Sequence, residues 1–238
     1  SPVGDEEEAL AIGLEALVVG EEAGQPFTAA VAHGTVAASL RRLMRLDEAL
    51  DHAGSAIRTF RELGARWELA GALGDRGAAY RVAGRLEEAE TDLREAFVLC
   101  RDLQERALVP WTAAELARIL AMRGGPSAAR SILSEPSTKL AEGEPGSATA
   151  LLTAECVVAM AEDDRATARA KARSAIEVEG GPGAPPNVHA GQVWWAGMLF
   201  GADDVGGPEA LDEARATLER HHWAQALREP DLVADLLA

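Results

Sequence analysis

The sequence predicts an all-α protein built from stacked antiparallel helical hairpins. The composition is the first reason: 49 of the 238 residues are Ala and only ten are aromatic, while strand-forming residues are few. Such a chain favours helices that pack closely through small side chains, and it excludes an all-β fold. The second reason is a period of 40 residues, because the segment Gly84–Ala89 (G-R-L-E-E-A) has counterparts at that spacing.

The 40-residue period extends over the first half of the chain. The counterparts of Gly84–Ala89 are Gly4–Ala9, Met44–Ala49 and Gly124–Ala129. We call a set of positions that lie 40 residues apart a column. Several columns hold identical or similar residues: Ala9, Ala49, Ala89 and Ala129; Ala16, Ala56 and Ala96; Leu17, Ile57 and Phe97; Ala37, Gly77 and Ala117. Agreement over several columns indicates a repeated structural unit.

Each period contains two helices. Apolar residues keep helical spacing from Leu69 to Tyr80 and again from Leu86 to Leu103. Between the two helices, Gly77 and Ala89 are expected to be buried at a close helix contact. Helix breaks are predicted near six positions: Gly24, Met44, Gly64, Gly84, Gln104 and Gly124.

Five residues of one period resemble the tetratricopeptide repeat in order and spacing: Gly77, Tyr80, Gly84, Ala89 and Ala96. The period of 40 is longer than usual in that family and resembles the lengthened repeats of maltose-regulator-type transcription activators and related bacterial signal-transduction ATPases. Leu73 stands where the family has its signature Trp. The resemblance implies a right-handed superhelical solenoid of about 11–12 helices, whose first helices line a concave groove that binds peptides or protein segments.

The repeats are expected to be regular over residues 1–140, and residues 141–238 to form degenerate repeats and capping helices of the same solenoid. Two segments interrupt the pattern: a polar linker at Glu142–Ser147 and a Gly/Pro-rich break at Gly180–Pro186. Beyond them we expect helices at Val188–Gly201, Pro208–His222 and Pro230–Leu237.

The N-terminal segment aligns with the second helix of a repeat. Residues 4–23 match that helix, and no first helix stands before them. One interpretation is an arm excised from a larger protein with further repeats or an effector domain upstream. The other is a natural capping helix.

Charge and cysteine content narrow the class of function. The chain has 23 basic and 39 acidic residues, a net charge of −16, so direct binding to nucleic acid is not expected. No signal peptide or membrane-spanning stretch is recognisable, which favours a cytoplasmic protein. Of the basic residues, all but Lys139 and Lys171 are Arg, a bias typical of a high-GC bacterial genome.

No residue pattern points to catalysis, a metal or a cofactor. Cys100 and Cys156 fall in apolar or small-residue columns and are expected to be core thiols. His221 and His222 are adjacent and so point apart on a helix, which does not favour a metal site. Phosphate-binding and nucleophile-elbow motifs are absent from the sequence. We therefore expect a protein that is not an enzyme.

The predicted ligand-binding strip consists of arginines on the first helices. Arg41 and Arg81 share a column, and Arg118 lies one turn earlier in the next repeat. Three further residues are expected on the same concave face: Trp111, Asp75 and Glu115. Exposed arginines there suit an acidic peptide through bidentate hydrogen bonds. In the alternative, the arginines are solvated or are paired with the two acidic residues across repeats.

Two classes of function follow. In the first, the protein is the sensor or interaction arm of a larger bacterial transcriptional or signalling regulator and binds a protein or peptide. In the second, it is a scaffold that associates with itself, with no ligand groove. Neither class requires a cofactor, a nucleic acid or a membrane.

Overall fold

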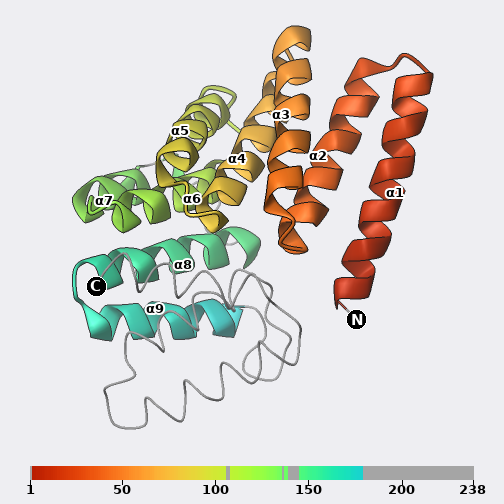
Figure 1. The fold of residues 1–238 in the computed structure, drawn as a ribbon. Coiled ribbons are helices and arrows are strands. Elements are labelled where there is room, and N and C mark those ends of the chain that lie inside the picture. Colours follow the sequence, from red (N-terminus) through yellow and green to blue (C-terminus); the bar gives the residue numbers. More distant parts are fainter. Residues whose placement is uncertain (1, 106–107, 136, 139–144, 179–238) are drawn as a thin grey trace. The chain divides into compact units, whose positions relative to one another are not determined.

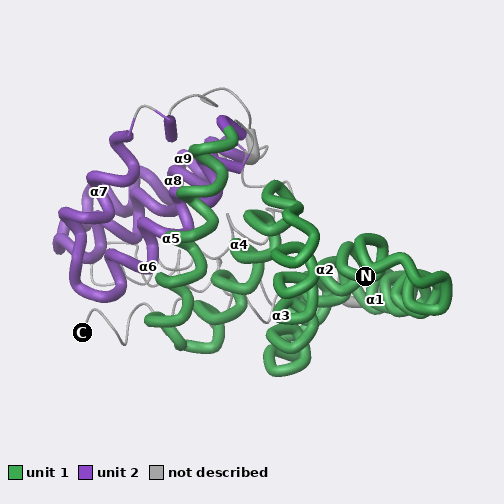
Figure 2. Tube along the Cα trace, turned by 90° about the horizontal axis from the view of Figure 1, so that it is seen from above, with its two compact units in different colours: residues 1–103 green, residues 104–238 purple. Residues whose placement is uncertain are grey.

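The computed structural model describes residues 2–105, 108–135, 137–138 and 145–178. Over these residues the regular secondary structure is helical, as the all-α prediction requires, and nine α-helices follow one another along the chain (Figure 1). The chain forms two compact units, Ser1–Leu103 and Gln104–Ala238 (Figure 2). The helices expected at Val188–Gly201, Pro208–His222 and Pro230–Leu237 lie outside the described residues, as does the break at Gly180–Pro186.

The first unit holds five helices of similar length: α1 (Pro2–Glu22), α2 (Pro26–Arg42), α3 (Leu46–Leu63), α4 (Arg66–Val82) and α5 (Leu86–Asp102). Each helix packs against the next along the chain, so the unit is a row of antiparallel hairpins (Figure 1). The pairs α2–α3 and α4–α5 are the two complete hairpins of the predicted 40-residue period.

The second unit holds four described helices: α6 (Leu108–Met122), α7 (Pro126–Ser134), α8 (Pro145–Ala161) and α9 (Arg165–Val178). Helix α6 packs against both α7 and α8, and α8 packs against α9. One sequence-based expectation is wrong here, because the linker predicted at Glu142–Ser147 is partly helical. Pro145 begins α8, and proline suits a first helical position since it lacks an N–H that would have no partner there.

The six predicted helix breaks are confirmed. Each of the six positions has a left-handed φ between 56° and 79° and stands between two helices. The turns share one pattern of hydrogen bonds: at Gly84, for example, its N–H donates to Arg81 O (2.9 Å) and the next N–H, of Arg85, donates to Tyr80 O (2.9 Å). This is the Schellman arrangement, which ends a helix by a residue in the left-handed conformation. A turn at every twentieth residue fixes the helix length.

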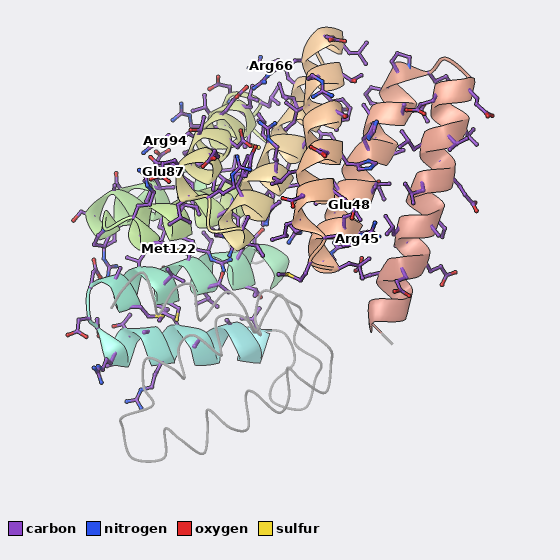
Figure 3. All side chains as sticks on the ribbon, in the orientation of Figure 1. Arg45, Glu48, Arg66, Glu87, Arg94 and Met122 are labelled. Carbon is purple, nitrogen blue, oxygen red and sulfur yellow. The ribbon has the colours of Figure 1, made fainter. Side chains whose placement is uncertain are left out.

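An ion pair repeats at the start of each second helix. Arg45 and Glu48 face each other at the start of α3 (Figure 3), with both guanidinium-to-carboxylate contacts within 2.7 Å. Forty residues later Arg85 donates to Glu88 in the same way, at 2.9 Å. These pairs place an acidic side chain in the first turn, where the helix dipole favours it.

Small residues allow the helices of a hairpin to approach closely. Gly77 and Ala89 are both buried, as predicted. A Cβ added at Gly77 would lie 2.6 Å from Leu93 Cγ, so α4 touches α5 through that glycine. The core around this contact contains Phe60 and Leu73 together with buried alanines of α2, α3, α4 and α5.

Candidate functional site

The three predicted arginines are buried, so the expectation of a solvent-exposed strip is wrong. Arg41 is 6% exposed, Arg81 1% and Arg118 3%. Arg41 and Arg81 lie at equivalent positions in the last turns of α2 and α4, which confirms their shared column. Arg118 belongs to the second unit. The sequence pattern identified the register but not the side chains that cover it.

Arg118 forms an ion pair inside its own helix. Its Nη1 donates to Glu115 Oε1 at 3.0 Å, and both side chains are almost completely buried in α6. The sequence-based alternative had Glu115 pair with an arginine across repeats, whereas the observed partner is one turn away. A buried pair of this kind offsets the cost of removing two charges from water.

Asp75 and Trp111 are both partly exposed. Asp75 lies in the middle of α4, in the first unit, and Trp111 lies in the first turn of α6, in the second unit. Within the first unit, the face of α2 around Gly34 is open, since a Cβ there would meet no atom within 4 Å. The equivalent face of α4 is largely closed, with Gly74 and Ala78 buried.

A histidine pair links α2 to α3, and sequence reasoning missed it. Nδ1 of His33 lies 2.9 Å from Nδ1 of His52, and both rings are half-buried. The contact requires at least one neutral ring, since two protonated nitrogens cannot share it. Burial and the neighbouring His52 lower the pKa of His33, with Arg58 acting in the same direction and Glu21 opposing them. The two residues are equidistant from the turn that joins their helices, which is the signal that could have revealed the pair.

The same column carries an ion pair in the next hairpin. Asp92, 40 residues after His52, accepts two hydrogen bonds from Arg76 of α4, at 2.6 and 2.9 Å. The bond to Asp92 raises the pKa of Arg76. The pair therefore stays charged at physiological pH and fastens α4 to α5.

The thiols and acidic groups show no arrangement suited to catalysis in the described part of the chain. Cys100 and Cys156 are free and buried. Burial raises the pKa of Cys156 to about 12, so its reactive thiolate form is scarce. Among the described residues, no group of three or more His, Cys, Asp or Glu side chains is placed to hold a metal. His221 and His222 lie outside those residues.

Membrane insertion was tested on the same residues. None of the described helices combines the length and the apolar character that a bilayer crossing requires.

Helix α1 exposes large apolar side chains on the surface that faces away from α2. Four of them are at least 42% exposed: Ile12, Leu14, Val18 and Val19. The opposite side of α1 packs against α2, where a Cβ added at Gly13 would lie 3.0 Å from Val36 Cγ2. An apolar helix face of this kind is typical of a protein interaction site. Sequence reasoning noted that α1 has no first helix before it but did not derive this exposed face.

Comparison with known proteins gives one structural similarity. The pilF protein of Pseudomonas aeruginosa, from a study of its functional characterization, has a solved structure that is similar to this chain with a TM-score of 0.47 and 17% sequence identity. The match covers 97% of this chain and 99% of that chain. No protein-family model and no curated protein matches this chain.

Proposed function

We propose that this protein is a non-catalytic protein-binding module of helical repeats, serving as the sensor or interaction arm of a larger bacterial transcriptional or signalling regulator. The observation that carries the proposal is the exposed apolar face of α1, where Ile12 is 60% and Val19 63% exposed. Apolar side chains of this size, gathered on one helix, gain stability when a partner covers them.

The regulatory part of the proposal is supported by the repeat pattern. The segment Gly84–Ala89 and its counterparts at 40-residue spacing resemble the lengthened repeats of bacterial regulators. The confirmed turns show that the period is real in this chain. In a row of stacked hairpins, a partner that binds one helix influences the neighbouring repeats through their interfaces.

An acidic peptide bound at Arg41, Arg81 and Arg118 stays a prediction. Exposures of 1–6% mean that the guanidinium groups are reached only if the covering side chains move. The apolar face of α1 requires no such rearrangement. For this reason the proposed function places the first contact with a partner on α1.

Photocrosslinking tests the proposed function. The photoreactive residue benzoylphenylalanine would replace Val19 in the protein expressed in its source organism, and Glu62, an exposed residue of α3, in the control. We expect the same crosslinked protein in every repetition with the Val19 probe and none with the Glu62 probe. The absence of a crosslinked protein at Val19, or identical products at both positions, would reject the proposal.

A further inference from the structure

Helix α1 carries a heptad pattern on its exposed side. Four small or apolar residues alternate at spacings of three and four: Ala9, Ile12, Ala16 and Val19. This is the a/d spacing of a helix that pairs with another helix. We call these four residues the α1 seam. Ile12, Ala16 and Val19 are exposed, and Ala9 is partly exposed.

The columns of the α1 seam are covered in the other second helices. Ala16 is exposed, whereas Ala56 of α3 and Ala96 of α5, in the same column, are completely buried. Ala9 is partly exposed, whereas Ala49 and Ala89 are buried. The seam is thus a surface that this fold covers wherever a first helix precedes it.

The structure shows what covers these columns in the two complete hairpins. Helix α2 reaches the seam column of α3 through His33 and His52, whose Nδ1 atoms lie 2.9 Å apart. Helix α4 reaches the same column of α5 through Arg76 and Asp92 at 2.6 Å. The covering element is in both cases an antiparallel helix. In α1 this column holds Ile12, so its cover must offer an apolar side chain.

Acidic residues line one edge of the α1 seam. Glu8, Glu15 and Glu22 follow one another at seven-residue intervals, directly before successive a positions, and all three are exposed. Residues 2–22 include seven acidic and no basic side chains. Charged residues at this heptad position pair with the opposite charge on the partner helix.

We propose that the α1 seam docks an amphipathic helix of a partner protein whose apolar stripe is flanked by Arg or Lys. The apolar stripe covers Ile12, Ala16 and Val19 as a first helix covers α3 or α5. The basic flank pairs with Glu8, Glu15 and Glu22. This inference rests on the proposed protein-binding function and names the chemistry of the partner.

A second copy of this chain fits the seam poorly. In an antiparallel pair of α1 helices, Glu15 of one copy would face acidic residues of the other, and like charges at that distance repel. In a parallel pair the glutamates would face Gly13 and Gly20, which offer no charge. A basic partner helix satisfies the glutamates in either direction.

Two synthetic peptides test the chemistry of the docking surface. Both are about 21 residues long with Leu at a and d; one carries Lys and the other Glu at e and g. Fluorescence anisotropy of the labelled peptides, titrated with the whole protein, gives the affinities. We expect the Lys peptide to bind, with an affinity that falls as salt rises, and the Glu peptide not to bind.

Matched variants locate the binding. Ile12→Gln/Val19→Gln on the seam should weaken the Lys peptide about tenfold or more, because the apolar contact is lost. Leu14→Gln/Val18→Gln, equally exposed but off the seam, should change the affinity by less than about twofold. All four side chains are exposed, so each variant should keep the helical content and melting temperature of the wild type. Glu15→Lys should weaken the Lys peptide and let the Glu peptide bind.

The inference is overturned if the Lys peptide does not bind, if both peptides bind equally, or if both double variants lose affinity to the same degree. Sedimentation that shows a dimer abolished by Ile12→Gln/Val19→Gln would also overturn it, because a second copy would then cover the seam. A protein crosslinked at Val19 without any binding of the Lys peptide would reject the basic-helix chemistry and leave the protein-binding function standing.

Discussion

The hairpins α2–α3 and α4–α5 share a backbone design but are fastened by different chemistry. In α2–α3 the seam column holds His52, which meets His33. In α4–α5 the same column holds Asp92, which is bound by Arg76 through two hydrogen bonds. One contact depends on a neutral imidazole, and the other stays charged over the physiological range.

The apolar contact beside each fastening also differs. Gly77 and Leu93 meet in the second hairpin, and the first hairpin has Ala37 and Ala53 in those columns. A large residue opposite the smallest one replaces two residues of intermediate size, so the helices can approach in both cases. A repeated fold therefore fixes where a contact occurs and leaves its chemistry free to vary.

Breaking the ion pair should have the largest effect. Asp92→Ala leaves Arg76 partly buried without its carboxylate partner, and we expect the free energy of unfolding of the first unit to fall by about 2–4 kcal/mol in urea titrations. The double variant Arg76→Met/Asp92→Leu should recover most of this loss because no charge then stays in the contact. Glu48→Gln, which breaks an exposed pair, serves as the control and should leave the urea midpoint unchanged.

The glycine contact should rank next. Gly77→Ala places a Cβ 2.6 Å from Leu93 Cγ, so we expect a loss of about 1–3 kcal/mol in the same titrations. In the background of Leu93→Ala, which recreates the alanine pair of the first hairpin, Gly77→Ala should cost much less. Equal costs in both backgrounds would show that the steric contact is not the cause.

Acidic pH should distinguish the two hairpins. Because the pKa of His33 is lowered in the folded protein, the unfolded chain binds its proton more readily. The stability from the histidine pair is complete above about pH 6.5, the ordinary His value, and is lost as the pH falls through the pKa of folded His33. Amide exchange compared at neutral and acidic pH should show α2 and α3 losing protection before α4 and α5.

His33→Gln is the matched variant for the pH experiment, since its amide can still bond to His52 but does not titrate in this range. The early loss of protection in α2 and α3 should be smaller in this variant. An unchanged pH response would assign the acid sensitivity to another group.

The smallest expected effect is stabilising. A Cβ added at Gly71, on the first helix of the second hairpin, meets no atom within 4 Å. Gly71→Ala should raise the free energy of unfolding by about 0.5–1 kcal/mol, because alanine restricts the unfolded chain and favours the helix. Since Gly71 and Gly77 lie on one helix, opposite signs for the two substitutions would show that packing, not helix propensity, decides them.

The sequence predicted the turns correctly because their signals are local. Glycines at four of the six positions suit the left-handed conformation, and regular spacing identified Met44 and Gln104 without one. Exposure is a different matter. Ala16, Ala56 and Ala96 are the same residue in one column, yet only Ala16 is exposed. The columns likewise aligned Arg41 with Arg81 but could not show that neighbouring side chains cover them.

The equal spacing of the left-handed turns makes the hairpin an exchangeable unit. Removal of residues 45–84 would join Met44 to Arg85, the residue that follows the next equivalent turn, so the local backbone geometry at the junction would be preserved. Helix α5 would then follow α2 directly and bring Asp92 opposite His33. Recombination within the gene can therefore change the number of hairpins, and the pairing across each one, without designing a new loop.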